Sequence, residues 1–420
     1  MSTNPRLHWA WVILGVCFVN LFINYSIRLG YGVVLPEMIR DLKLGRAAGG
    51  TIYNAYLLTY ILVTPFTGFL TDRLGARRVI TVCCLFLCLG IGLMGTADSL
   101  LTASIYYAIA GLGATGMWTP VITLVQRWFA FHRRGLALGI LSTGYGLGFA
   151  SMGALFPLIV LHLNWRYTWY LLGLLAGIMI VVNLLLLKSD PAGAGYRPWG
   201  EGAKEKTDVL GQPPPGEANS LADVFKNRNF WLLGFSYFAI AYALYGATTF
   251  MVDYAEYQLN FSLEKSSFLA TIHGLSQLAG VLIILPLSDI WGRKKTILIS
   301  NLMIVLALTG LLFTGSSWVM LCLAVSGMAV FYGATFPIYG ACAGDYFPRE
   351  HMGTVIGAWT PFYGAGAIAT HWISGLLRDR TGVYDHAFFI NIMMAAVALI
   401  LIAAVSEQKK PIICKKSPSC

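Results

Sequence analysis

The sequence predicts an all-α integral membrane protein with twelve transmembrane helices in two six-helix pseudo-repeats. Three observations lead to this fold class. Only 11% of the 420 residues are charged, whereas soluble domains carry about 25%. The chain contains twelve mainly apolar runs, each near the length of about 20 residues that a spanning helix needs. The two halves of the chain also share short motifs at a fixed spacing.

The apolar runs and the polar stretches between them predict the organisation of the domains. Spans are expected at 9–36, 49–70, 79–97, 100–126, 135–161, 167–188, 229–254, 265–287, 296–315, 317–341, 353–377 and 385–405. The longest polar stretch contains GQPPPGEANS and lies between the sixth and seventh spans. We therefore expect an N-terminal six-helix bundle (1–188), a cytoplasmic linker (189–228), a C-terminal six-helix bundle (229–405) and a basic tail (406–420). Within the linker, SLADVFKN predicts a short interfacial helix with Ser220 as its cap.

The basic residues predict the orientation in the membrane. Most of the 29 Lys and Arg residues fall in loops on the same side as both termini, and such loops face the cytoplasm. We therefore expect a multi-pass protein of the plasma (bacterial inner) membrane with both termini cytoplasmic. The net charge of +10 follows from this topology rather than from nucleic-acid binding. The eight Cys residues lack metal-ligand spacing, and we interpret them as buried thiols.

The motifs that the two halves share lie at an offset of 217 or 218 positions. GFLTDRLGARR (68–78) follows the second span and LPLSDIWGRKK (285–295) follows the eighth. Further pairs are Gly116 and Gly333, Pro120 and Pro337, and Tyr145 and Tyr363. Parallel repeats of this kind place a substrate site between the halves, near the middle of the bilayer.

The first of these motifs resembles the G-x-x-x-D-R-x-G-R-R signature of the major facilitator superfamily. The resemblance implies the major facilitator fold and a cytoplasmic gate that latches the halves in one state. Plain positive-inside anchoring is the alternative. The second copy departs from the signature at Leu285 and Ile290, so a weaker latch is expected there. The gate residues are Gly68, Asp72, Arg73, Gly75, Arg77, Arg78, Asp289 and Arg293.

A narrower resemblance is to the monocarboxylate transporter and oxalate:formate antiporter branch of that superfamily. It is carried by Trp9-Ala10-Trp11, by RRGLALGILSTGYGLG (133–148) and by EKSSFLATIHGLSQLAG (264–280). In the last stretch the branch carries an Asp and, four residues later, an Arg, which bind the proton and the carboxylate. This chain has Gln277 and Val281 at those positions. The departure leaves both the proton coupling and the carboxylate clamp open.

A polar stripe in the first span supplies the main binding candidates. Asn20, Asn24 and Arg28 are spaced four residues apart, and Tyr31 follows three residues later, so they share one helix face. A guanidinium offers a planar fork of donors that suits a carboxylate. The alternative is that Arg28 snorkels to the outer interface.

Other polar residues at membrane depth are weaker candidates. In the seventh span we expect Tyr245 to bind substrate and Asp253 to be a counter-ion for Arg28, a proton carrier or a plain interfacial carboxylate. In the eighth span Gln277 is a substrate candidate and His273 a proton carrier, with a satisfied buried histidine as the alternative. Tyr145 and Tyr363 would bind substrate from opposite halves, or only pack.

The sequence contains no P-loop, catalytic constellation or metal-ligand spacing, so we expect no enzyme activity, cofactor or metal. The expected function is secondary active transport of a small organic anion, with a monocarboxylate first, coupled to protons. The alternatives are anion exchange of the oxalate/formate type, and uniport or efflux of a neutral or amphipathic compound. A membrane receptor on the same scaffold is disfavoured by the short loops.

Overall fold

The computed structural model describes residues 8–130, 133–200, 221–347 and 352–406. These residues are mainly helical, as their apolar composition predicts. The α-helices are α1 (Trp9–Arg28), α2 (Tyr31–Asp41), α3 (Arg46–Leu74), α4 (Ala76–Met94), α5 (Leu100–Ala114), α6 (Thr119–Trp128), α7 (Arg134–His162), α8 (Trp165–Leu186), α9 (Leu221–Lys226), α10 (Arg228–Tyr257), α11 (Leu263–Trp291), α12 (Arg293–Leu312), α13 (Trp318–Tyr346), α14 (Met352–Thr381) and α15 (Asp385–Ala403).

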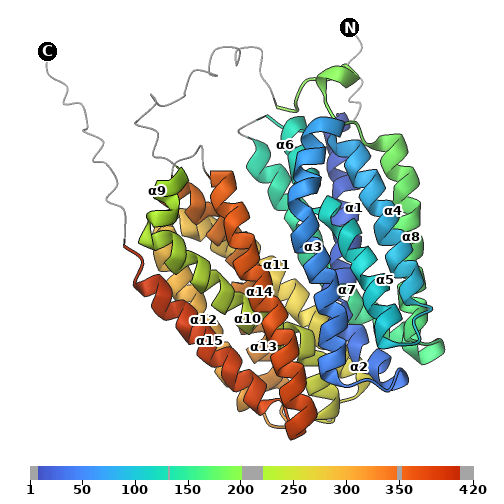
Figure 1. Cartoon of the computed structure of the whole chain (residues 1–420), viewed down its shortest axis with the longest axis vertical. Coiled ribbons are helices and arrows are strands. Elements are labelled where there is room, and N and C mark those ends of the chain that lie inside the picture. Colours follow the sequence, from blue (N-terminus) through green and yellow to red (C-terminus); the bar gives the residue numbers. More distant parts are fainter. Residues whose placement is uncertain (1–7, 131–132, 201–220, 348–351, 407–420) are drawn as a thin grey trace, which may run out of the picture.

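The helices form two bundles that stand side by side (Figure 1). Helices α1 to α8 form the first bundle, and α9 to α15 form the second. The start of α1 and the end of α15 lie at one end of the molecule, which we call the termini face. The opposite end, where α2 ends at Asp41, is the far face. The ribbons of α3 and α14 lie closer together near the far face than near the termini face (Figure 1).

The helix boundaries repeat at the offset seen in the motifs. Helices α3 and α11 begin and end 217 positions apart, and α7 and α14 begin 218 positions apart. Gly75 and Gly292 end α3 and α11 with φ values of 84° and 89°, a region that glycine enters without steric cost. The two motif copies therefore make the same turn. The expected all-α membrane fold with two pseudo-repeats is confirmed.

Among the described residues, ten helical segments are long and apolar enough to span a membrane, with α1 and α2 counted as one segment and α5 to α6 as another. The predicted second and eleventh spans are not among these ten segments. They correspond to α3 and α14, which have 29 and 30 residues. At about 1.5 Å per residue, helices of this length exceed the roughly 30 Å of a hydrocarbon core. These two helices are less apolar because part of each faces the other half of the protein.

The first span differs from the prediction in its end and its regularity. It extends to Asp41 rather than ending at residue 36, and it is interrupted between Arg28 and Tyr31. A Cβ added at Gly30 would lie 2.0 Å from the Ser26 carbonyl oxygen and 2.6 Å from Cγ of Met152. Glycine is therefore required where α1 passes into α2.

The two bundles meet through α3 with α14 and through α7 with α11. The Asn54 side-chain amide donates to the carbonyl of Ile368 (3.0 Å), and the Thr271 hydroxyl donates to the carbonyl of Ala150 (2.8 Å). The two donors, Asn54 and Thr271, correspond by the repeat offset, and so do the two acceptors, Ala150 and Ile368. The interface between the halves therefore follows the pseudo-symmetry of the chain.

The described first part of the linker packs on the N-terminal bundle. The Trp199 ring lies 4.9 Å from Trp11 and 5.7 Å from Phe129, between ring centroids. Its backbone N–H donates to the Trp128 carbonyl (2.8 Å). The expected short helix is present as α9, whereas its predicted cap, Ser220, lies outside the described residues, as do GQPPPGEANS and most of the basic tail.

Candidate functional site

Arg28 ends α1 inside the protein. Its side chain belongs to a residue that is only 5% exposed, and α2 continues the span beyond it to Asp41. A snorkelling guanidinium must reach water or lipid headgroups. The alternative that Arg28 snorkels to the outer interface therefore does not hold.

Tyrosines from both halves surround the Arg28 guanidinium. Nη2 of Arg28 donates to the Tyr245 hydroxyl (2.9 Å), and the Tyr363 hydroxyl donates to the same oxygen (2.5 Å). Cζ of Arg28 lies 4.9 Å from the centroid of the Tyr60 ring and 5.9 Å from that of Tyr25, within the range of cation–π attraction. Because the Tyr245 oxygen accepts two hydrogen bonds, its own proton remains available for another acceptor.

The charge of Arg28 has no anionic partner in the part of the chain that the structure describes. No described carboxylate oxygen lies within 4 Å of its nitrogens, and its Nε has no hydrogen-bond partner among the described residues. A buried charge without a partner costs several kcal/mol. The position is therefore one that an anionic ligand would stabilise.

The predicted stripe in the first span does not stay together. The Tyr56 hydroxyl donates to Asn24 at 3.4 Å, so Asn24 faces the same aromatic region as Arg28. Asn20 exchanges hydrogen bonds with Asn183 of α8 at 2.7 and 3.1 Å. Its amide is thus satisfied within the N-terminal bundle, on the side away from the C-terminal half.

Tyr31 is also held by its own bundle. Its ring stacks at 5.0 Å on both Tyr53 and Tyr107, and its hydroxyl donates to the Gly49 carbonyl (2.7 Å). The break at Gly30 turns Tyr31 away from the register of the stripe. Tyr31 therefore supports the wall of the site rather than offering a free hydroxyl to it.

The C-terminal half and α7 contribute the remaining predicted substrate residues. Gln277 is completely buried, and neither atom of its amide has a hydrogen-bond partner among the described residues. The Tyr145 ring packs edge-on against Tyr25 at 4.1 Å, and its phenol faces Tyr332 and Gln277. Arg28, Tyr245, Tyr363, Tyr145 and Gln277 thus gather between the two halves.

Asp253 lies elsewhere, at the far face. Its carboxylate accepts from Nε and Nη2 of Arg46, both at 3.2 Å, and from the Tyr384 hydroxyl at 2.5 Å. The suggestion that Asp253 is a counter-ion for Arg28 is therefore wrong, since its cation is Arg46 on α3. The side chain is completely buried, which also argues against a plain interfacial carboxylate.

A second contact joins the halves beside this ion pair. The carboxylate of Asp379 on α14 accepts the backbone N–H groups of Arg46 (2.8 Å) and Ala47 (2.9 Å) at the start of α3. These N–H groups have no partner within their own helix, and the helix dipole favours a negative charge there. Asp253 and Asp379 of the C-terminal half thus bind the N-terminal end of α3 in the other half. These contacts close the far face.

Two buried histidines of the C-terminal bundle, His273 and His371, have different environments. Nε2 of His273 lies 3.4 Å from the Thr248 hydroxyl, and its Nδ1 has no hydrogen-bond partner among the described residues. His371 bridges the halves, with Nδ1 2.7 Å from the Asn54 side-chain oxygen and Nε2 3.0 Å from the Thr249 hydroxyl. His371 therefore connects the two halves through hydrogen bonds, whereas the described hydrogen-bond contact of His273 stays within the C-terminal half.

The gate motif makes its described contacts within single halves. Asp72 lies 3.7 Å from Arg127 of α6, the Arg73 guanidinium lies over the Phe69 ring at 4.4 Å, and Arg293 lies 3.5 Å from Asp345. Gly68, Arg77 and Arg78 lie at the same end of α3 and the start of α4, where the Arg77 backbone N–H donates to Ser189 at 3.1 Å. The side chain of Asp289 lies outside what the structure describes.

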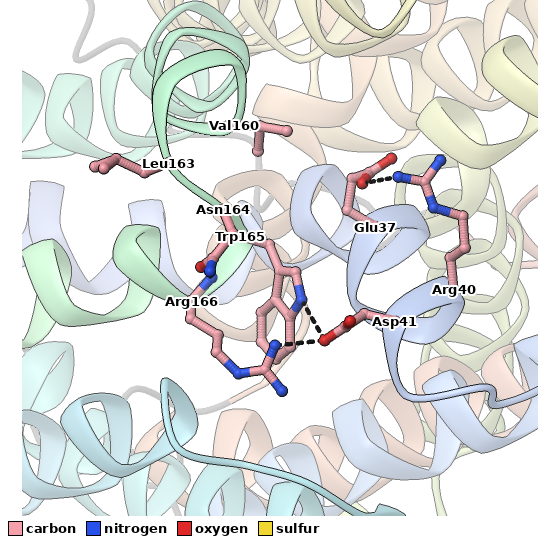
Figure 2. A pocket seen from close by; sticks show the side chains of 8 residues that line it. All are labelled: Glu37, Arg40, Asp41, Val160, Leu163, Asn164, Trp165 and Arg166. Atoms are coloured by element: carbon pink, nitrogen blue, oxygen red, sulfur yellow. Dashed lines mark hydrogen bonds and ion pairs between the residues drawn. The ribbon is translucent and has the colours of Figure 1, made fainter.

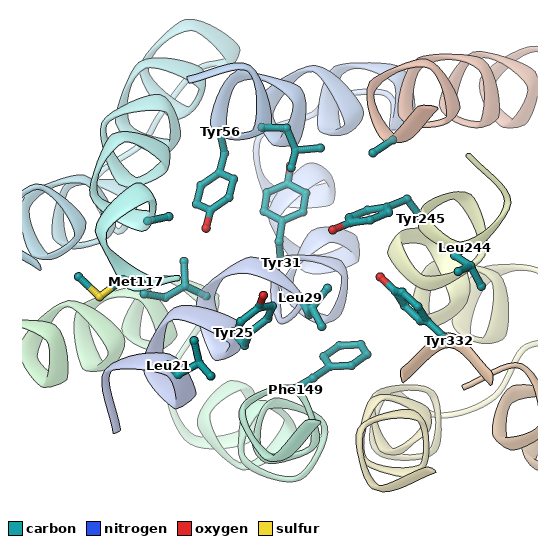
Figure 3. Close-up of a cluster of buried hydrophobic side chains, with 14 of the residues drawn as sticks. Leu21, Tyr25, Leu29, Tyr31, Tyr56, Met117, Phe149, Leu244, Tyr245 and Tyr332 are labelled. Carbon is teal, nitrogen blue, oxygen red and sulfur yellow. The ribbon is translucent and has the colours of Figure 1, made fainter. Parts of the chain in front are cut away.

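Several site residues were missed from the sequence. Tyr53, Tyr56 and Tyr60 recur at helical spacing on α3, and this aromatic stripe was the available signal. Tyr332 carried no comparable signal, because its neighbours come from other helices. Figure 3 shows the hydroxyls of Tyr25, Tyr245 and Tyr332 directed toward the region between the two bundles.

A surface cavity of about 340 Å³ opens on the N-terminal bundle at the far face (Figure 2). Its charged side chains are already paired, Arg40 with Glu37 and Arg166 with Asp41, and Trp165 also donates to Asp41 (3.1 Å). Such a cavity offers no free charge to a ligand. The Arg28 cluster is therefore the stronger candidate site.

Comparisons with known proteins agree with this architecture. The chain is similar to a hexuronate transporter of Bacillus subtilis (strain 168), with 23% identity over 95% of this chain and 94% of that protein. It is also similar to monocarboxylate transporter 4 of Mus musculus, with 22% identity over 97% of this chain and 86% of that protein.

A solved structure has the same fold. It is a bacterial homologue of the human lysosomal transporter Spinster in an inward-facing and unoccupied conformation, with a TM-score of 0.70, 15% identity and coverage of 96% of both chains. The family model of the Major Facilitator Superfamily matches residues 17–266 and 233–415, and thus both halves. The chain belongs to the major facilitator superfamily.

Proposed function

We propose that this transporter carries a small organic anion, and that Arg28 is the residue that holds it. The chain is a secondary transporter of its family and not an enzyme. The observation that carries the proposal is the buried Arg28, which has tyrosine partners from both halves and no described carboxylate within 4 Å. A carboxylate placed there would receive a charge-assisted hydrogen bond.

The relatives support an anion in general and leave the individual substrate open. The names of the two curated relatives refer to a hexuronate and to monocarboxylates, and both classes carry a carboxylate. A monocarboxylate remains the first expectation from the sequence. Uniport or efflux of a neutral compound is the less favoured candidate, because it would leave the Arg28 charge unpaired.

We place the termini face in the cytoplasm, as the basic loops predict. The far face would then be extracellular, and the contacts of Arg46 with Asp253 and Asp379 would make this an inward-facing state. Alternating access would break those contacts and bring the gate motif of α3 against the other half. The described contact of Asp72 with Arg127, within the N-terminal half, fits a gate that is released here.

The titratable groups that lie between the halves support the proposal that transport is coupled to protons. His371 bridges α14 and α3, and Asp253 joins α10 to α3. The His273 ring of α11 meets the Phe149 ring of α7 edge-on at 5.2 Å. A proton that bound at one of these contacts would change the balance between the two states. Anion exchange without a proton is the second candidate.

Uptake of labelled anions into proteoliposomes tests the proposal. Arg28→Gln should reduce uptake of the transported anion at least about a hundredfold, because the variant loses its charge-assisted contact. Arg40→Gln is the matched control, since Arg40 also contacts a tyrosine of the other half (3.3 Å to Tyr257) but lies at the far face. Normal anion uptake by Arg28→Gln would defeat the proposal.

The same assay separates the modes of transport. Uptake that rises with an inward proton gradient indicates symport, and uptake that requires internal anion indicates exchange. Uptake that ignores both conditions would contradict both modes and would indicate uniport.

A further inference from the structure

A second group of buried polar atoms lies beyond Tyr245 as seen from Arg28. It consists of the amide of Gln277, the hydroxyl of Tyr332 and Nδ1 of His273. All three residues are 0% exposed, and these atoms have no hydrogen-bond partner among the described residues. A buried polar atom that lacks a partner destabilises the folded protein, so a cluster of them needs an explanation.

The three side chains are neighbours held in place by close helix packing. His273 and Gln277 are four residues apart on α11 and share a face, and the Tyr332 ring of α13 meets the His273 ring edge-on at 5.4 Å. A Cβ added at Gly333 would lie 2.2 Å from the Gln277 carbonyl oxygen. Helices α11 and α13 therefore touch backbone to backbone at this level, which limits how far the group can rearrange.

One tyrosine separates this group from Arg28. The Tyr332 ring lies 6.5 Å from the ring of Tyr245, which accepts the hydrogen bond of Arg28. From the other side, Tyr145 faces both Tyr332 and Gln277. Figure 3 shows the hydroxyls of Tyr245 and Tyr332 directed into the same space. A ligand bound at Arg28 would therefore have its far end near the unpartnered atoms.

The chemistry of the group selects against two classes of anion. A second carboxylate would need a cation, and the group offers an amide, a phenol and an imidazole nitrogen. An alkyl chain would add no partner for any of these polar atoms, which have only the nearby Tyr145 phenol. A carboxamide, a phenol and a neutral imidazole each offer both a donor and an acceptor, which is what an alcohol hydroxyl requires.

We propose that the substrate is a hydroxycarboxylate, with its carboxylate on Arg28 and its hydroxyls on Gln277, Tyr332 and His273. This inference rests on the proposed function, because it needs the anion to be held at Arg28. A site built to hydrogen-bond a hydroxyl rejects the analogue that lacks it, since the buried polar groups then stay unpaired. The sequence alone predicted a monocarboxylate without specifying hydroxyl groups.

Matched pairs of acids test the inference. Binding to the purified full chain is measured by titration calorimetry for gluconate against hexanoate and for glycerate against propionate. We expect the hydroxy acid to bind at least about tenfold more tightly in at least one pair. Equal or tighter binding of the unsubstituted acid in both pairs would overturn the inference.

Variants assign the preference to the group. Gln277→Leu and Tyr332→Phe should each bring the affinity ratio of the preferred pair close to one. Tyr242→Phe is the matched control, because it removes another buried hydroxyl of the same half that has no described partner and should leave the ratio unchanged. If Gln277→Leu does not fold, the conservative Tyr332→Phe carries the test. A ratio that survives Tyr332→Phe would overturn the assignment.

The outcomes also separate this inference from the proposed function. Acids that bind in an Arg28-dependent manner without a hydroxyl preference would leave the proposed function intact and remove the hydroxycarboxylate. If no acid in either pair binds and Arg28→Gln changes nothing, both fail.

Discussion

Arg28 and Tyr245, which form a hydrogen bond of 2.9 Å, occupy the same position in the two repeats, 217 residues apart. Two equivalent residues can touch only where they meet the pseudo-twofold axis that relates the repeats. Arg40 and Tyr257 have the same separation and lie 3.3 Å apart further toward the far face. The candidate anchor thus lies on the axis, where a rocking motion of the halves changes access from both sides around it.

Tyr245→Phe should raise the KM for the transported anion about tenfold and change protein stability little. The variant keeps the ring but removes the hydroxyl that accepts from Arg28 and Tyr363. A hydrogen bond to a charged group contributes about 1.5–3 kcal/mol. The measurement is initial uptake rate against anion concentration in proteoliposomes.

Tyr254→Phe is the control for this prediction. Tyr254 lies on the same helix and donates to the Leu311 carbonyl at 3.2 Å, inside its own half. The Tyr254→Phe substitution should leave the KM for the anion unchanged. Equal KM values for Tyr245→Phe and the unmodified protein would show that the tyrosine does not position the anchor.

Asp253→Asn should shift the protein toward states with an open far face. The substitution removes the charge that pairs with Arg46 and leaves that cation, 24% exposed at its side chain, without its main partner. A loss of about 1–3 kcal/mol would lower the ratio of closed to open far faces roughly 5- to 150-fold. Spin labels at Leu163 and Phe313, exposed positions of the two halves, would report a longer distance.

Asp385→Asn is the matched control for Asp253→Asn. Asp385 accepts from Gln258 at 2.6 Å, and both residues belong to the C-terminal half. Its substitution should leave the label distance unchanged. If both variants give the distance distribution of the unmodified protein, the ion pair does not hold the far face closed.

Asn20→Ala should destabilise the N-terminal bundle without changing substrate affinity. Asn20 and Asn183 exchange two hydrogen bonds in the protein interior, and the substitution leaves Asn183 unpaired. Pairs of this kind contribute about 0.5–2 kcal/mol in membrane proteins, which predicts a lower Tm. An increased KM at unchanged Tm would instead support a place for Asn20 in the substrate path.

His371→Gln should abolish the stimulation of uptake by a proton gradient and retain anion exchange. The Asn54 amide donates to the Ile368 carbonyl, so its oxygen is the acceptor for Nδ1 of His371 and the second nitrogen faces Thr249. A glutamine keeps polar contacts between the halves and cannot take up a proton. The measurements are gradient-driven uptake and counterflow.

His162→Gln is the control histidine, at the exposed end of α7, and should retain full stimulation. If His371→Gln keeps its response to the gradient while His273→Gln loses it, the carrier expected from the sequence is correct and His371 is only a contact between the halves.

The sequence by itself determined the helix inventory, the repeat and the presence of a charge at depth. Apolar runs, glycine turns such as those at Gly75 and Gly292, and the offset between motifs are local or periodic features. They persist in the folded protein because the bilayer and the helix impose the same periodicities wherever the chain lies. These features were sufficient to select Arg28 as a candidate for substrate binding.

Only the tertiary structure decided which polar groups meet. Asp253 pairs with Arg46, 207 positions away, and Asn20 with Asn183, 163 positions away. Helix spacing had placed Asn20 in the substrate stripe, and the sequence had left the partner of Asp253 open. Tyr332 joined the site through packing against His273 and Tyr245. Helix spacing shows that residues share a face, but the partner on the opposing helix depends on how the bundles rotate and pack, and that is set by contacts between distant segments.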